Sequence, residues 1–125
     1  MAEEAWALQY SDGSNNRLRV WLDGEAIRYD FAPTTPAQSS SGTYSGGRAA
    51  HGLLPDPHVA ELWSRIQALA GHSEWHTPHR TMGSGAFTVA IGDDEQHFRV
   101  RPCKALADLD AWLRATLNLG RAGHV

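Results

Sequence analysis

The first third of the chain alternates between apolar and polar residues, which is the two-residue period of strands with one buried face. Three such runs follow one another over residues 6–31, separated by turn-forming residues. Asp23-Gly24 separates the second run from the third, and an Asp-Gly pair in that position is a strong signal for a β-hairpin. The apolar positions of the three predicted strands are Trp6, Leu8 and Tyr10, then Leu18, Val20 and Leu22, then Ile27, Tyr29 and Phe31.

A helix is predicted over residues 56–71. Asp56 is the expected cap of its free amides, Pro57 suits the first helical position, and Gly71 closes the far end. Apolar residues recur at intervals of three and four, so one stripe of the helix faces a core. The stripe consists of Val59, Leu62, Trp63, Ile66, Leu69 and Ala70.

A second hairpin and a second helix complete the pattern. Residues 87–91 and 97–101 alternate like strands, and residues 92–95 form the turn between them. Pro102 ends the second strand, and a helix is expected from there to about Gly120. The apolar positions of this helix are Leu106, Leu109, Trp112, Leu113 and Leu117.

The predicted order of elements is β-β-β-α-β-β-α. Hairpins imply antiparallel pairing, and strands with one apolar face need cover on that face only. We therefore expect an α+β fold with a four- to five-stranded antiparallel sheet and two helices packed on one face. The chain of 125 residues suits a single domain, residues 1–125, with a frayed tail at 121–125. In element order it is similar in outline to small bacterial protease inhibitors of the emfourin type, and no residue role is carried over.

Periodicity disappears over residues 32–55, which predicts a long loop rich in serine, glycine and proline. Tyrosine offers a rigid contact area, while serine and glycine offer adaptable hydrogen bonds, so this composition suits recognition of a partner. A surface loop without a role is the alternative. The candidate binding residues of the loop lie within 38–47: Ser39, Ser40, Ser41, Thr43, Tyr44 and Ser45.

Arginines gather on the polar side of the predicted strands. With the apolar residues turned toward the helices, the opposite face carries five of the ten arginines together with Trp21. Arginine and tryptophan are enriched where proteins bind one another. The alternative is a solvated face whose charges pair across strands with residues such as Glu25 and Asp30. The candidate binding residues of this face are Arg19, Trp21, Arg28, Arg99 and Arg101, accompanied by Arg17 and His97.

Composition narrows the range of partners and compartments. The net charge of −3 gives no overall attraction to nucleic acid, and Trp21 is the main aromatic residue on the arginine face, so a nucleic-acid partner is not expected. No apolar run approaches the ~18 residues of a membrane helix, so a membrane partner is not expected either. Cys103 is the only cysteine, which excludes an internal disulfide and favours the reducing cytoplasm.

Three histidines lie close together between the first helix and the second hairpin. His72, His76 and His79 are spaced by four and three residues, and three imidazoles with one water would complete a zinc site. Pro78 breaks the helix that would hold the three rings on one face. A polar loop with solvent-facing histidines is therefore the favoured interpretation, and no cofactor is expected, with zinc as the alternative.

No set of residues in the sequence matches a known catalytic motif. The leading hypothesis is a small non-enzymatic protein-binding module, such as an inhibitor, an immunity protein or an accessory protein. Its partner would be another macromolecule, recognised through loop 38–47 and the arginine-bearing face. The alternatives are a metal-binding protein or metal-dependent enzyme that uses His72, His76 and His79, and a homodimeric structural protein.

Overall fold

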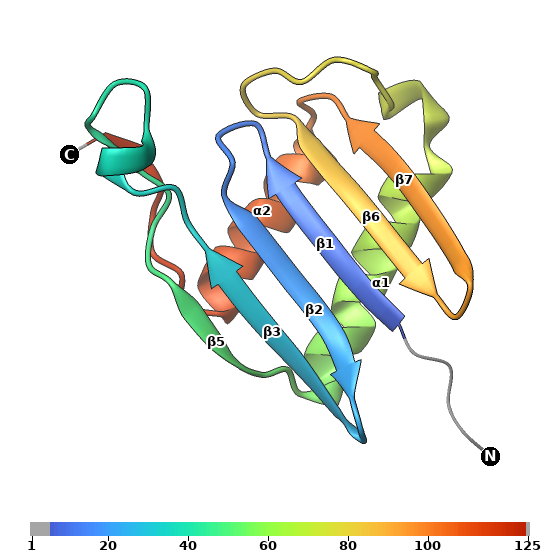
Figure 1. The fold of residues 1–125 in the computed structure, drawn as a ribbon. Coiled ribbons are helices and arrows are strands. Elements are labelled where there is room, and N and C mark those ends of the chain that lie inside the picture. Colours follow the sequence, from blue (N-terminus) through green and yellow to red (C-terminus); the bar gives the residue numbers. More distant parts are fainter. Residues whose placement is uncertain (1–5, 125) are drawn as a thin grey trace.

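Six strands form one sheet in the computed structural model, which describes residues 6–124 (Figure 1). The strands lie in the order β5-β3-β2-β1-β6-β7, and all neighbouring strands are antiparallel. The centre of the sheet is β1, which lies between its neighbour in sequence, β2, and the distant β6. The bounds are β1 Trp6–Asp12, β2 Arg17–Asp23, β3 Ala26–Ala32, β5 Ala50–Leu53, β6 Gly85–Ile91 and β7 Asp94–Val100.

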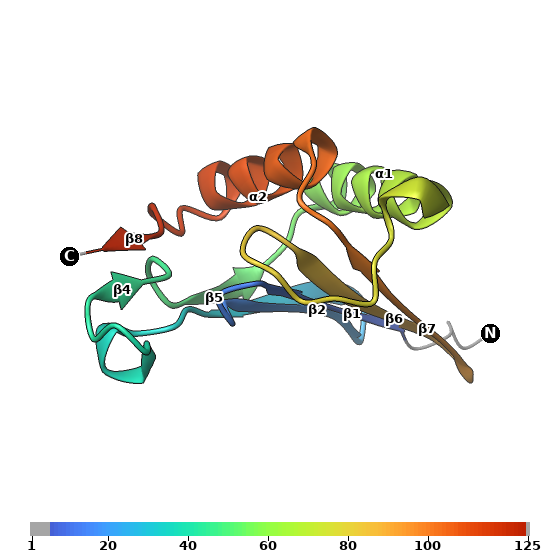
Figure 2. The same ribbon diagram turned by 90° about the horizontal axis from the view of Figure 1, so that it is seen from above.

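Both helices cover the same face of the sheet and leave the other face uncovered (Figure 2). They are α1, Asp56–Gly71, and α2, Lys104–Thr116. The predicted α+β architecture, with an antiparallel sheet and two helices, is thereby confirmed. Within residues 6–124 no helix has the length and apolar character needed to cross a membrane.

The sheet has six strands, so the prediction of four or five was wrong. The additional strand is β5, which pairs with β3 in the register Arg28 to Leu53 and Asp30 to His51. It lies inside the segment 32–55, which was expected to be a loop throughout. The strand Ala-His-Gly-Leu has no run of alternating apolar residues, and Gly52 packs beside the ring of Tyr29. Its position is set by pairing with β3 and not by a pattern of its own.

Other parts of the expected loop and tail are also ordered. The loop contains the 3-10 turn η1, Pro36–Gln38, and the short strand β4, Tyr44–Ser45. The strand β4 pairs with β8, Gly123–His124, in the segment that was expected to fray. The two segments are held together by the pairing of β4 with β8, which no local sequence pattern predicts. Val125 lies outside the described residues.

The core lies between the sheet and the two helices. Alternate residues of β1, β2, β3 and β6 point into it, together with Phe98 and Val100 of β7, and each helix contributes one stripe. Ile91, at the end of the alternating run in β6, is instead 42% exposed. Trp6 packs on Trp63 of α1, which attaches the start of the sheet to that helix. The buried apolar residues are Leu8, Tyr10, Leu18, Val20, Phe31, Leu54, Leu62, Ile66, Leu69, Phe87, Val89, Val100, Leu106, Leu109, Leu113, Leu117 and Leu119.

Several predicted boundaries are displaced by a few residues. The register pairs Asp23 with Ala26, so the hairpin turn is Gly24-Glu25, with Gly24 at a φ of +65°. Asp56 lies inside the first turn of α1 and makes no side-chain cap, because Pro55 occupies the capping position. At that position the negative carboxylate still interacts favourably with the positive end of the helix dipole. At the other boundaries, Gly71 is the last residue of α1 and α2 ends at Thr116, short of Gly120.

Candidate functional site

The uncovered side of the sheet, which we call the open face, carries Trp21 with Arg19 on the same strand and Arg28 on the neighbouring strand. Strand pairing aligns one residue from each strand in a row across the sheet: Leu53, Arg28, Trp21, Ala7, Ala90 and Glu95. The guanidinium carbon of Arg19 lies 4.7 Å from the ring centre of Trp21, a cation–π contact. Arg28 donates from Nε to Asp23 at 2.6 Å. The indole of Trp21 therefore lies between two arginines at the surface of the sheet.

Two arginines of the open face keep their charge available to solvent. Arg17 and Arg19 are exposed and form no ion pair with any residue in the described range. Asp30 is the register partner of Arg19, yet the two charged groups do not come within ion-pair distance. The strand β2 thus presents two cationic groups, those of Arg17 and Arg19, that an approaching acidic surface can neutralise.

A hollow lies beside these arginines on the same face. It has a volume of about 390 Å³, and small side chains in neighbouring strands, among them Ser11, Ala32 and Ala86, leave the space open. Arg17 and Arg19 stand at its border, with Asp30 beside them. Arg17 also borders a second hollow of about 310 Å³ formed with Asn15, Pro33, Thr34 and Gln38.

The remaining members of the predicted arginine face bind other residues of the same chain. The guanidinium of Arg99 donates to the carbonyl oxygen of Pro78 at 3.1 Å, and that of Arg101 donates to the carbonyl of Glu74. His97 forms an ion-pair contact with Glu95. The two arginines fasten the segment before β6 to the end of β7, and they keep their positive charge because a carbonyl oxygen does not neutralise a guanidinium.

The candidate loop 38–47 uses part of its polar side chains internally. Ser39 Oγ donates to the carbonyl of Pro36 and accepts from the amide of Gly42, and Ser45 Oγ accepts from the amide of Gly47. The hydroxyl of Tyr44 accepts from Asn16 Nδ2 at 2.8 Å. Of the six candidate binding residues in the loop, the structure leaves Ser40, Ser41 and Thr43 exposed.

The three predicted metal-ligating histidines point to different partners. His72 Nδ1 lies 2.9 Å from Glu74 Oε1, and the ring of His72 stacks on Trp75. This hydrogen bond holds the pKa of Glu74 below its usual value. His76 Nε2 lies 2.9 Å from the carbonyl oxygen of Leu69, and His79 is exposed. No group of three or more His, Cys, Asp or Glu side chains suited to a metal ion occurs among the described residues.

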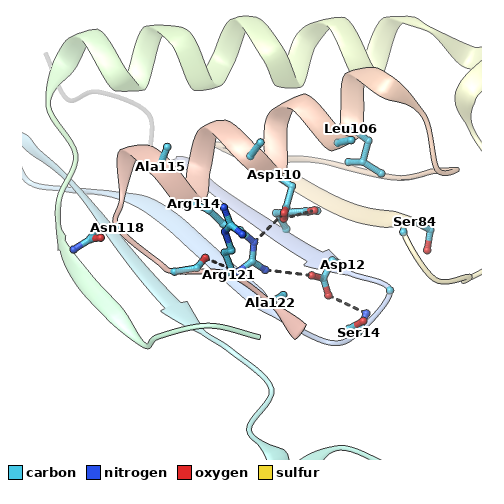
Figure 3. Close-up of a pocket in the computed structure, with 16 residues that line it drawn as sticks. Asp12, Ser14, Ser84, Leu106, Asp110, Arg114, Ala115, Asn118, Arg121 and Ala122 are labelled. Atoms are coloured by element: carbon cyan, nitrogen blue, oxygen red, sulfur yellow. Dashed lines mark hydrogen bonds and ion pairs between the residues drawn. The ribbon is translucent and has the colours of Figure 1, made fainter. Parts of the chain in front are cut away.

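A cleft that the sequence did not indicate lies between α2 and the end of the sheet (Figure 3). Its volume is about 730 Å³, within the usual range of small-molecule sites. The wall on α2 is formed by Leu106 and a stripe of alanines, and the facing wall by two turns that contain glycine and serine. The cleft is lined by Tyr10, Asp12, Gly13, Ser14, Gly83, Ser84, Leu106, Ala107, Asp110, Ala111, Arg114, Ala115, Asn118, Gly120, Arg121 and Ala122.

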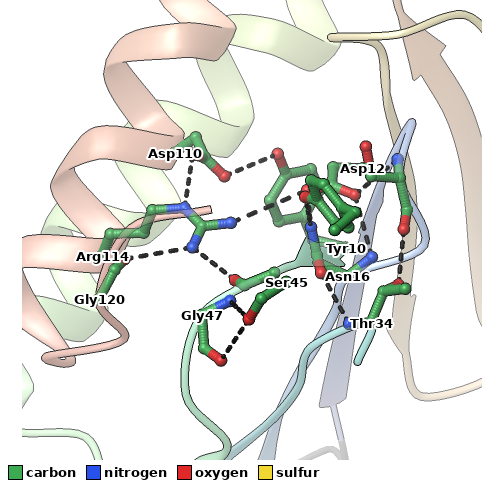
Figure 4. A network of polar contacts seen from close by, with 12 residues as sticks. Tyr10, Asp12, Asn16, Thr34, Ser45, Gly47, Asp110, Arg114 and Gly120 are labelled. Atoms are coloured by element: carbon green, nitrogen blue, oxygen red, sulfur yellow. Dashed lines mark hydrogen bonds and ion pairs between the residues drawn. The ribbon is translucent and has the colours of Figure 1, made fainter. Parts of the chain in front are cut away.

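Arg114 is the centre of a polar network in the wall of this cleft (Figure 4). Its Nε donates to Asp110 at 2.9 Å, and its Nη1 donates to the carbonyl oxygens of Gly46 at 2.7 Å and Gly120 at 3.2 Å. Its Nη2 lies 4.0 Å from the carboxylate of Asp12. One side chain of α2 thereby joins the loop after β3, the C-terminal segment and the turn after β1.

Asn16 and Tyr10 extend the network into the protein. The buried side chain of Asn16 donates to Asp12 and Tyr44 and accepts from the amide of Thr34, so its amide group is fully used. Tyr10 donates to Asp110 Oδ1 at 3.4 Å and stacks on Phe87. Burial, followed by the charges of Asp110 and Asp12, raises the pKa of Tyr10 far above its usual value. Tyr10 is therefore a neutral hydroxyl donor at physiological pH.

Comparison with known proteins adds no assignment. No family model, no curated protein and no solved structure matches the chain. The similarity to the emfourin type is therefore one of element order alone. The function must be argued from the open face and the cleft.

Proposed function

We propose that the protein is a non-enzymatic protein-binding module whose open face docks an acidic surface of a partner protein. The observation that carries this proposal is the helix-free sheet face on which Trp21 lies next to Arg19 and Arg28, with the unpaired Arg17 further along the same strand. Tryptophan and arginine supply most of the binding energy at many protein interfaces. Guanidinium groups also suit the bidentate geometry of carboxylates.

The shape of the face supports a protein partner. Leu53, with 58% of its surface exposed, lies in the same row as Trp21 and extends the apolar contact toward the edge of the sheet. The hollow beside Arg17 and Arg19 has room for an acidic side chain that reaches down from the partner. A contact of this kind combines an apolar centre with charged groups around it, as is typical of specific interfaces.

The loop 38–47 is the second part of the proposed surface. Figure 2 shows the segment around η1 beyond the end of β3, displaced toward the side opposite the helices. Gln38 and Arg17 border the same hollow, so the base of the loop and the cationic strands are contiguous. The exposed hydroxyls of Ser40, Ser41 and Thr43 extend the contact surface from there.

Charge reversal on the open face tests the proposal. Proteins captured by the wild type are purified, and their dissociation constants are measured by calorimetry against wild type, the double variant Arg17→Glu/Arg19→Glu and the control Lys104→Glu. Lys104 is an exposed cation on α2, on the helix side of the molecule. We expect the double variant to weaken binding at least about tenfold and to reduce its salt dependence, with no change for the control.

Two outcomes would contradict this function. Equal affinity of wild type and the double variant for every purified partner would remove the open face from recognition. A dimer of the protein alone, seen by light scattering and dissociated by the double variant, would mean that the face binds a second copy. The homodimeric alternative would then replace a separate partner.

A further inference from the structure

The cleft beside α2 is kept open by the small residues around it. Ala107, Ala111 and Ala115 follow one another at intervals of four on α2, and the turns opposite contribute Gly13 and Gly83. Gly13 is also fixed by close packing, since a Cβ there would lie 2.1 Å from the carbonyl oxygen of Thr81. Residues of α2 line the cleft, so it lies on the helix side of the sheet and is separate from the open face (Figure 3).

Polar atoms in the wall of the cleft can form more hydrogen bonds than the described residues supply. Arg114 Nη2 makes no hydrogen bond to any residue in the described range, and its approach to Asp12 is 4.0 Å. Among the residues that the structure describes, only Tyr10 donates to Asp110 Oδ1, over a long 3.4 Å bond, and the Asp110 side chain remains 35% exposed. The wall thus offers an acceptor and a donor at the same place. A hydroxyl group, which both donates and accepts, satisfies the two together.

The charges around the cleft cancel. Within residues 6–124, the charged side chains that line it are two carboxylates, Asp12 and Asp110, and two guanidiniums, Arg114 and Arg121. A ligand with net charge would therefore lose hydration without gaining an opposite net charge in return. The alanine stripe and Leu106 provide the apolar wall against which carbon–hydrogen groups pack.

We propose that this cleft binds a small uncharged molecule that carries neighbouring hydroxyl groups, such as a sugar or a polyol. Its hydroxyls donate to the carboxylate of Asp110 and accept from the guanidinium of Arg114, while its carbon skeleton lies along the alanines of α2. The assignment does not depend on the open face, because different residues of the other side of the sheet carry the protein-binding proposal.

Titration of the isotope-labelled protein, followed by amide chemical shifts, tests the assignment. The probes are methyl α-D-glucopyranoside, methyl β-D-ribofuranoside and myo-inositol, with D-glucuronate and D-glucosamine as an anionic and a cationic counterpart. We expect saturable shifts for at least one neutral probe at amides of Ala107, Ala111 and Ser84. The charged counterparts should bind at least about tenfold more weakly than that neutral probe.

A matched pair of variants tests whether the probe binds in the cleft. Ala111→Leu fills the cleft from an exposed position on α2, whereas Ala68→Leu makes the same change at an exposed position on α1. Leucine is a good helix former, so both variants should fold, which their amide spectra will show. Binding should be lost in the first variant and kept in the second. Absence of saturable shifts with all three neutral probes, tighter binding of a charged probe, or binding unaffected by Ala111→Leu would overturn the proposal.

Discussion

At the scale of single residues, two neighbouring glycines show how closely the loop after β4 is packed. A Cβ on Gly46 would lie 1.6 Å from Asn16 Oδ1, and Gly47 adopts a φ of +114°, which favours glycine. Asn16 has no room to move, since its side chain already bonds to Asp12, Thr34 and Tyr44. From the sequence, these glycines were expected only to be part of a long loop. They are required by the close approach of two segments of chain.

Gly46→Ala should lower the free energy of unfolding by about 1–3 kcal/mol, because the added methyl group displaces a fully bonded, buried amide. Gly71→Ala is the control. A Cβ there meets nothing within 4 Å, so that variant should gain about 0.4–1 kcal/mol. Urea denaturation of both variants measures the difference, and equal stabilities would contradict the packing described for Gly46.

Tyr10 predicts how stability depends on alkaline pH. Its pKa is raised in the folded protein, so the folded state holds the phenolic proton more tightly than the unfolded chain does. This contribution is fully present below the unfolded pKa of about 10 and decreases above it, by up to about 1.4 kcal/mol per pH unit. Urea denaturation between neutral and strongly alkaline pH should show a steeper loss for wild type than for Tyr10→Phe. Identical slopes would mean that Tyr10 ionises freely in the folded protein.

At the scale of elements, the sequence predicted those strands and helices in which apolar residues recur at a regular spacing. Strands and helices with an apolar stripe were predicted, because residues such as Leu18 and Val20, or Leu62 and Ile66, repeat the geometry of their element. The strand β5 was missed, because its pairing with β3 requires no pattern in Ala50–Leu53 itself. The cleft was missed for a related reason. Its residues come from well-separated segments, and small side chains such as Ala111 give no signal in a sequence.

Arg114 should be the most sensitive connection between elements. Arg114→Met keeps the aliphatic bulk and leaves Asp110 and the carbonyls of Gly46 and Gly120 without their donor. We expect a loss of about 2–4 kcal/mol in the free energy of unfolding, together with faster proteolysis of residues 34–48. The exposed Arg121, replaced by Met, should change stability by less than about 0.5 kcal/mol. Equal effects of the two substitutions would contradict the role given to Arg114.

At the scale of the whole molecule, the sheet separates two surfaces of different chemistry. The open face is a sheet surface with a shallow hollow beside the unpaired arginines of β2, and it is the surface that we propose docks a macromolecule. The cleft on the helix side is concave, neutral overall and of a size that suits a small molecule. The arginine face was predicted from alternation alone, whereas the cleft depends on how α2 meets the turns at the end of the sheet. Each surface can therefore be altered by substitution while the other is kept.

The central position of β1 has a consequence for how the protein is made. One neighbour of β1 is reached through a short turn, but the other, β6, begins only at Gly85. While the chain emerges from the ribosome, β1 lacks this neighbour until β6 has been synthesised, and the apolar face that carries Leu8 and Leu18 is fully covered only once α2, Lys104–Thr116, has also been made. Contacts that are distant in sequence also slow folding. The nascent chain therefore passes through a stage in which apolar surface is exposed, and a chaperone can bind that surface.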